Sequence, residues 1–177
     1  MKKTMMLAVF TVLVCLLAAW PKPVRAQGNY EVVTGDAFTR AVPADFYLEG
    51  NRIPVEKSNA ALVKSPKGAR LVVALIDTTG YSSRIQQKYI GMIITESTTS
   101  VCGNALGVGS YGFGLERPAP SSNADAPFKI YNQAGEKVGE CAAKKDDSIA
   151  QPRPLAVVPD KTGSAKILLG KYGIEIK

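Results

Sequence analysis

The sequence contains no histidine, and this absence removes several kinds of active site at once. A Ser-His-Asp or Cys-His arrangement needs an imidazole base, and many catalytic zinc sites need imidazole ligands. The Ser-x-x-Lys motif of another nucleophile class is also absent. We therefore expect no enzyme of these classes, no metal site and no cofactor.

Long hydrophobic runs are scarce too, and the longest lies at the N-terminus. Lys2 and Lys3 precede an apolar run at residues 5–20, and a Pro-Lys-Pro segment follows it. This pattern is typical of a secretory signal peptide over residues 1–26, with cleavage between Ala26 and Gln27. The run is shorter than the roughly 20 residues that a membrane-spanning helix needs. A retained anchor is the less favoured alternative, and a lipid anchor on Cys15 is weaker still.

The charge of the chain changes once this leader is removed. Four of the 22 basic residues lie in it (Lys2, Lys3, Lys22 and Arg25), but none of the 15 acidic residues does. The mature chain keeps 18 basic residues (22 minus 4) against 15 acidic ones, a net charge of +3 instead of +7. Nucleic-acid binding normally needs a basic stripe interleaved with aromatic residues, so we expect no nucleic-acid partner.

Cysteine and tryptophan are rare, and the leader takes one of each, Cys15 and Trp20. The two remaining cysteines, Cys102 and Cys141, are most simply one disulfide in an oxidising compartment. A metal-binding or catalytic pair is less favoured, because the chain has no histidine and no Cys-x-x-Cys.

Short strands separated by turn residues dominate the mature chain. The apolar run at residues 71–76 predicts a central strand buried on both faces, preceded by a Ser-Pro-Lys-Gly turn at 65–68. An earlier hairpin is expected to turn at residues 50–51, with Pro54 placing its second strand at an edge or ending it early. About eight to ten strands predict a mostly-β protein, a single antiparallel sandwich or barrel. Further strands are expected at 60–64, 90–95, 128–131, 137–142, 155–158, 165–169 and 174–177.

One short helix is expected near residues 82–89. Ser82 or Ser83 can cap its N-terminus, and no strong helix breaker follows before Tyr89. Ile85 and Tyr89, four residues apart, would share one face. Residues 27–43 are expected to form an N-terminal arm, partly ordered, ahead of a β domain that spans residues 44–177.

The segment from Asp77 to Arg84 is the first candidate for a ligand site, since it follows the most buried strand and gathers several polar side chains. Its expected ligand contacts are Asp77, Tyr81, Ser82 and Arg84. The same residue types also form turns and helix caps, and we favour that structural interpretation.

A glycine-rich segment at residues 107–112 matches the Gly-x-Gly-x-x-Gly fingerprint of dinucleotide-binding proteins. The fingerprint requires a helix after the loop, and residues 113–118 (Phe-Gly-Leu-Glu-Arg-Pro) are poor helix formers. Glycines that let a strand bend or approach another backbone are the better explanation. A glycine-lined wall beside a ligand, with Tyr111 as a contact, is retained as an alternative.

Carboxylates offer the remaining route to catalysis. Glu49, Asp77 and Glu96 are candidates for a pair that cleaves a glycosidic bond, but no spacing brings two of them together. We therefore expect an exported bacterial protein, periplasmic or extracellular, with no membrane span in its mature form. Its expected role is non-catalytic binding of a small ligand, a polymer or an envelope protein. The alternatives are a structural or interaction protein without a ligand pocket and, less favoured, a carboxylate-dependent hydrolase.

Overall fold

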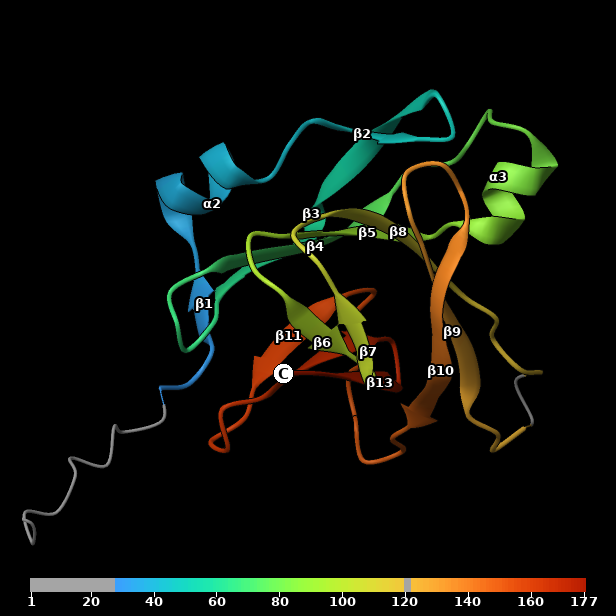
Figure 1. The fold of residues 1–177 in the computed structure, drawn as a ribbon. Helices are drawn as coiled ribbons and strands as arrows, with labels where there is room; N and C mark the ends of the chain where they lie inside the picture. The colour runs from blue at the N-terminus through green and yellow to red at the C-terminus, as the bar shows by residue number, and fades with distance from the viewer. Residues whose placement is uncertain (1–27, 120–121) are drawn as a thin grey trace, which may run out of the picture.

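The computed structural model describes residues 28–119 and 122–177, and these form strands and two short helices (Figure 1). The leader and the expected cleavage site at Ala26 and Gln27 lie outside the described residues. The elements are β1 (Glu31–Val33), α2 (Gly35–Ala41), β2 (Asp45–Leu48), β3 (Asn51–Lys64), β4 (Arg70–Ile76), α3 (Ser83–Lys88), β5 (Gly91–Thr95), β6 (Thr99–Val101), β7 (Asn104–Leu106), β8 (Gly109–Leu115), β9 (Ala126–Tyr131), β10 (Lys137–Lys145), β11 (Ala156–Pro159), β12 (Ala165–Leu169) and β13 (Tyr172–Ile176).

The strands form one antiparallel sheet that curls into a nearly closed barrel. Its strand order is β1-β3-β4-β5-β8-β9-β10-β13-β12-β11, while β2 pairs with β3, and β6 pairs with β7 and β13. The two ends of this path, β1 and β11, approach each other without pairing (Figure 1). The prediction of a mostly-β antiparallel fold is confirmed, and of the two architectures expected it is barrel-like.

Strand β4 lies between two hydrophobic cores, which explains its apolar side chains on both faces. Leu71 and Val73 point into the barrel interior, where they join the larger cluster. Val72 and Ala74 point to the outer face, which the β2–β3 hairpin and both helices cover. A strand buried on both faces has no polar alternation, so the interpretation of residues 71–76 is confirmed.

The β2–β3 hairpin turns one residue earlier than expected, at Glu49 and Gly50 instead of Gly50 and Asn51. Both turn residues have positive φ, 48° and 76°, as a two-residue turn matched to strand twist requires. The prediction that Pro54 ends the second strand or places it at an edge is wrong. Strand β3 continues to Lys64 between neighbours on both sides, and the carbonyl of Pro54 still accepts the amide hydrogen of Asp77.

Helix α3 forms where the sequence predicts a helix, and α2 is a second one that the pattern did not reveal. Ser82 caps α3 by accepting the amide hydrogen of Ile85, whose side chain is buried. Helix α2 lies within the expected N-terminal arm, has no side-chain cap and buries no residue completely. It therefore lacks both signals by which a helix is read from sequence. Strand β1 lies in the same arm, and Tyr30 just before it is buried in the barrel core.

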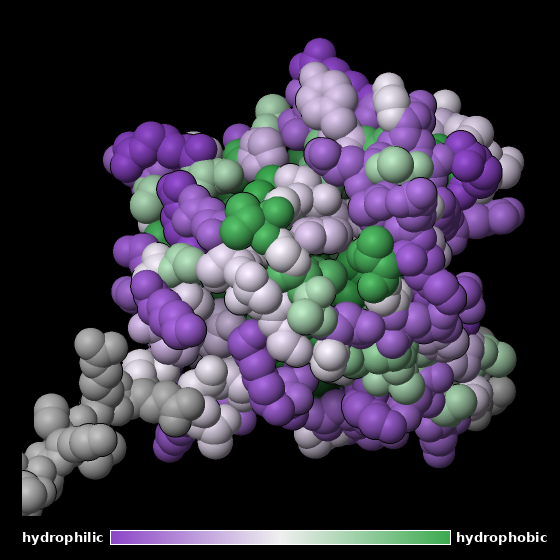
Figure 2. All heavy atoms as spheres, in the orientation of Figure 1, coloured by the Kyte–Doolittle hydropathy of each residue, from purple (hydrophilic) through white to green (hydrophobic). Residues whose placement is uncertain are grey.

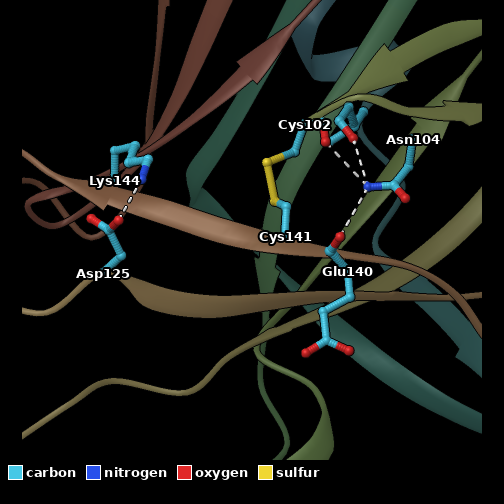
Figure 3. The surroundings of a disulfide bond; sticks show 7 residues. Cys102, Asn104, Asp125, Glu140, Cys141 and Lys144 are labelled. Atoms are coloured by element: carbon cyan, nitrogen blue, oxygen red, sulfur yellow. Dashed lines mark hydrogen bonds and ion pairs between the residues drawn. A yellow bond between two sulfur atoms is a disulfide. The ribbon is translucent and has the colours of Figure 1, made fainter.

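The predicted disulfide is confirmed and joins the β6–β7 turn to β10 (Figure 3). Cys102 and Cys141 have Cα atoms 6.2 Å apart. Cys102 and Gly103 form the two-residue turn, both with positive φ. The Asn104 side chain donates to the carbonyls of Cys102 and, at 3.4 Å, Glu140 on β10 (Figure 3). The bridge thus fixes a short hairpin against the barrel wall.

Candidate functional site

The barrel leaves one seam open, and a groove of about 470 Å³ lies along it. We call it the seam groove. One wall comes from β1, the start of α2 and the middle of β3, and the other comes from β11 and the segment before it. Its lining consists of residues 32–35, Phe38, residues 57–62 and residues 153–157.

A bulge in β3 shapes the first wall. The pairing of β3 with β4 shifts register between Glu56 and Ala60, so the residues between them leave the regular ladder. A bulge bends its strand and redirects the side chains nearby. The Asn59 amide donates to the Glu56 carboxylate over 2.8 Å, while Lys57 and Ser58 are exposed at the groove.

Strand β11 turns unpaired backbone groups toward the seam groove. The Asp160 amide donates to the Ser164 carbonyl over 2.8 Å, and these residues lie opposite each other in the β11–β12 register. Bonded and non-bonded pairs alternate along an antiparallel ladder. Val157, three residues from Asp160, therefore directs its N–H and C=O away from Ile167 on β12, toward the open edge.

Strand β1 has the same property on the opposite wall. The Ser65 amide donates to the Ala69 carbonyl over 2.8 Å, so Ser65 is a hydrogen-bonded position of the β3–β4 ladder and Leu62, three residues earlier, is a non-bonded one. The backbone groups of Leu62 therefore face β1, where they pair with Val33. Those of Val32, the preceding residue of β1, face away from β3. No strand of the described residues pairs with the second edge of β1 or of β11. The groove is thus bordered by two open sheet edges.

The charged side chains that line the seam groove are all positive. Lys57 and Arg153 line it, and no aspartate or glutamate does. Neither cation forms an ion pair with a carboxylate in residues 28–119 and 122–177. The rest of the lining is largely apolar, with Phe38, Leu62 and Leu155 among its side chains. On the face shown in Figure 2, hydrophobic atoms form small groups framed by hydrophilic side chains.

Three of the residues expected to bind a ligand in segment 77–84, Asp77, Tyr81 and Ser82, make structural contacts within the protein. Asp77 accepts the amide hydrogen of Thr79 at 2.9 Å, an Asx turn whose hydrogen bonds lower the pKa of the Asp77 carboxyl. Ser82 caps α3, and the Tyr81 hydroxyl donates to the backbone carbonyl of Arg52. Asp77 and Ser82 thus serve a turn and a cap, and Tyr81 joins the segment to β3. That they bind a ligand stays a prediction.

Arg84 belongs to a second cluster of charged groups, centred on Glu49 at the tip of the β2–β3 hairpin. The Glu49 carboxylate is 8% exposed and forms an ion pair with Arg84 at 2.5 Å. It accepts hydrogen bonds from the Lys88 ammonium and the Tyr89 hydroxyl, both at 2.7 Å. The bond from Lys88 lowers the pKa of Glu49, burial opposes that effect, and Tyr89 adds to it. Burial, and then Glu49 itself, raise the pKa of Tyr89. The cluster joins the hairpin tip to α3 and engages both oxygens of the Glu49 carboxylate.

Tyr111 lies apart from the segment 77–84 in the sequence and makes its own local bond, donating to the Gly107 carbonyl at 3.0 Å. It lines a shallow hollow with residues 108–110 and the β9–β10 turn at 132–134. The glycine-rich segment becomes β8, not a phosphate-binding loop before a helix. A Cβ on Gly114 would lie 2.2 Å from the Lys88 carbonyl, so close backbone packing explains the glycine there.

The three candidate carboxylates each have a nearby partner. Glu96 pairs with Arg70, whose hydrogen bond lowers the pKa of Glu96, and Glu49 and Asp77 are bound as described above. A glycosidase needs a carboxyl group with a raised pKa as its general acid. In Glu49, Asp77 and Glu96 the pKa of the carboxyl group is lowered instead.

Sequence reasoning did not identify the residues of the seam groove. Lys57 and Arg153 are isolated cations in segments far apart in the chain, and no periodicity marks them. The only available signal was Pro154 just before a short apolar run, which is consistent with an edge strand.

Among the described residues, no helix has the length and apolarity to cross a membrane. Nor do three or more acidic or cysteine side chains gather in residues 28–119 and 122–177 as a metal site would require. Comparisons of the chain with protein-family models, with curated proteins and with solved structures find no match.

Proposed function

We propose that this protein is an exported, non-catalytic binding module whose ligand lies in the seam groove and combines apolar surface with a negative charge. The observation that carries the proposal is the groove's lining, in which Lys57 and Arg153 occur without any acidic residue. A side-chain cation that has no ion-pair partner and lies beside apolar walls favours a ligand whose anionic group can pair with it.

The size of the seam groove supports the proposal. Its volume of about 470 Å³ lies within the range of small-molecule and peptide pockets. Phe38 and Leu155 offer apolar contact, and Thr34, Ser58 and Asn59 offer polar groups beside it. The carboxylates, by contrast, are engaged in ion pairs and turns, which favours binding over hydrolysis.

The Cys102–Cys141 disulfide supports export, because such bridges persist in oxidising compartments. Together with the signal-peptide pattern of residues 1–26, it favours a periplasmic or extracellular location.

The experiment is a fluorescence titration with anilinonaphthalene sulfonate, an aromatic sulfonate that has both required properties. The variants Lys57→Glu and Arg153→Glu should each weaken binding by about tenfold, the effect of losing one charge-assisted hydrogen bond. Lys67→Glu is the matched control, since Lys67 is exposed in the β3–β4 turn outside the groove and changes the net charge equally. Equal affinity in all four proteins, or no binding to the wild type, would refute the proposal.

A further inference from the structure

We infer that a second ligand site lies where the ends of β8 and β10 meet the β12–β13 turn, and that it binds a doubly charged oxyanion, a phosphate or a phosphate monoester. The site is a pocket of about 370 Å³, which we call the basic pocket. Its lining consists of Arg117, Lys145, Asp147, Pro152 and residues 169–172. The basic pocket shares no lining residue with the seam groove, so it is a separate site.

Backbone hydrogen bonds join the walls of the basic pocket. Lys145 lies opposite Tyr172 in the β10–β13 register, and the amide of the residue after Lys145 donates to the Lys171 carbonyl at 2.8 Å. The β12–β13 turn is bonded to the segment 152–153, because the Gly170 amide donates to the Arg153 carbonyl at 2.9 Å. The walls are therefore held together without a ligand, and binding does not have to gather them.

The side chains of this pocket carry an excess of positive charge. Arg117, Lys145 and Lys171 are cations and Asp147 is the acid among them, so three positive charges minus one negative charge leave +2. Arg117 forms no ion pair with a carboxylate in the described ranges 28–119 and 122–177. A phosphate monoester carries a charge of about −2 at neutral pH, which matches the excess.

Asp147 neutralises the two lysines only weakly. Its carboxylate lies 3.4 Å from the Lys145 ammonium and 3.6 Å from the Lys171 ammonium, and its side chain is 62% exposed. Charge-assisted hydrogen bonds are shorter, about 2.7–2.9 Å, and exposed ion pairs contribute little. The oxygens of a phosphate group can therefore compete with Asp147 for both lysines.

Lys145 and Arg117 offer donors that suit a phosphate group. The Lys145 ammonium has three N–H donors, and two of them bind the Ser122 carbonyl at 3.3 Å and the Asn123 side chain at 2.9 Å. These two bonds position the ammonium, and the third donor is left for an anion. Arg117 adds a planar guanidinium that can bind two oxygens of one phosphate at once.

Two other carboxylates near Lys145 are engaged outside the pocket. Asp125 forms an ion pair with Lys144 at 2.6 Å (Figure 3) and also accepts the amide hydrogen of Lys145. Asp146 accepts the amide and hydroxyl hydrogens of Ser148. Neither carboxylate lines the basic pocket, so neither occupies the place of an anion there.

The test is isothermal titration calorimetry of the mature protein at about pH 8 and low ionic strength, with phenyl phosphate as the probe. Benzenesulfonate is its matched control, since it has the same ring and a single negative charge. We expect phenyl phosphate to bind at least about fivefold more tightly, the effect of one further ion pair. Equal affinity for the two ligands, or no binding of phenyl phosphate, would overturn the inference.

Protein variants change the affinity for phenyl phosphate in opposite directions. Lys171→Gln and Arg117→Gln should each weaken it by about fivefold, whereas Asp147→Asn, which removes a competing negative charge, should strengthen it by about threefold. Lys161→Gln and Asp160→Asn are the matched controls, because both residues are exposed in the β11–β12 turn outside the pocket. They alter the net charge equally and should leave the affinity unchanged.

Two results with these variants would contradict the basic pocket. An equal loss in Lys161→Gln and Lys171→Gln would show attraction to a basic protein in general, and weaker binding in Asp147→Asn would show that the carboxylate does not compete. If Arg117→Gln fails to fold, the variants of Lys171 and Asp147 and the comparison of the two ligands still decide.

Two further probes identify what carries the phosphate. Inorganic phosphate represents the free ion, and phosphatidylcholine vesicles that contain phosphatidic acid represent a lipid headgroup. The probe whose binding is weakened by Lys171→Gln is the carrier that the pocket accepts. If Lys171→Gln weakens the binding of neither these probes nor phenyl phosphate, the site is overturned.

The variant Lys57→Glu separates this site from the seam groove. It should weaken the binding of anilinonaphthalene sulfonate and leave that of phenyl phosphate unchanged, since Lys57 does not line the basic pocket. If phenyl phosphate depends on Lys57 and not on Lys171, the proposed function stands and the basic pocket falls. If phenyl phosphate depends on Lys171 while the aromatic sulfonate does not bind, the reverse holds.

Discussion

The Glu49 carboxylate and the Lys88 ammonium lie 2.7 Å apart and connect three elements that are distant in the sequence. Glu49 is at the tip of the β2–β3 hairpin, and Lys88 ends α3. Lys88 also donates to the Gly135 carbonyl at 2.6 Å, and the Glu49 amide donates to the Gln133 carbonyl at 2.8 Å, both in the β9–β10 turn. Glu49 and Lys88 thus together hold a hairpin, a helix and a turn in place.

Replacing Glu49 with glutamine should lower the free energy of unfolding and remove part of its pH dependence. The variant leaves Lys88 without its carboxylate partner, which should cost about 2 kcal/mol at neutral pH. Because the pKa of Glu49 is lowered in the folded state, its contribution is present above the pKa of the unfolded chain. It is lost as the pH falls through the folded pKa. Urea titrations at neutral and acidic pH measure both effects.

Glu175→Gln is the control for this experiment, because the Glu175 carboxylate and the ammonium of its partner Lys177 are both largely exposed. An exposed ion pair contributes little, so we expect a change below about 0.5 kcal/mol. If the difference between wild type and Glu49→Gln is the same at both pH values, the linkage described here is incorrect.

The disulfide should account for a large part of the stability. Closing a loop between residues 39 apart stabilises the fold by about 4 kcal/mol on the chain-entropy account. The double variant Cys102→Ser/Cys141→Ser should lose about this amount, and reduction of the wild type should have a similar effect. Mass measurement after alkylation without reduction should find no free thiol in the mature protein. Modification of both cysteines would contradict the bridge.

Gly107, in the glycine-rich segment, and Gly114, near the end of β8, should differ sharply in their tolerance of alanine. A Cβ on Gly114 would meet the Lys88 carbonyl at 2.2 Å, whereas the nearest atom to a Cβ on Gly107 is the Tyr111 hydroxyl at 3.8 Å. Gly114→Ala should therefore destabilise the protein by about 3 kcal/mol and Gly107→Ala by less than about 1 kcal/mol. Thermal unfolding of both variants measures the difference. Equal effects would argue against close packing as the reason for glycine at 114.

The exported protein should begin at Gln27. Signal peptidases cut after a small residue, here Ala26, and the charged start and apolar run before it complete the pattern. Intact mass of the protein recovered from the cell envelope or the medium tests this. A mass that includes residues 1–26, or a lipid on Cys15, would contradict it.

Much of the fold could be predicted because its signals are local. The apolar run of β4, the turn residues at 65–68 and the Ser82 cap of α3 each express a property of adjacent residues. The turn at Glu49 was placed one residue off, since asparagine and glycine are both common in such turns and only the pairing register decides between them. Helix α2 was missed because it has neither a cap nor a fully buried face.

By itself, the sequence determined the class of the fold, the disulfide and the absence of histidine chemistry, since these depend on composition and on neighbours along the chain. The tertiary structure alone decided where β1 and β11 come together without pairing, and it alone placed Lys57 and Arg153 in one groove. It also showed that Glu49 is enclosed by Arg84, Lys88 and Tyr89. The reason is physical: strand pairing joins residues far apart in the chain, and no local pattern records which edges remain open.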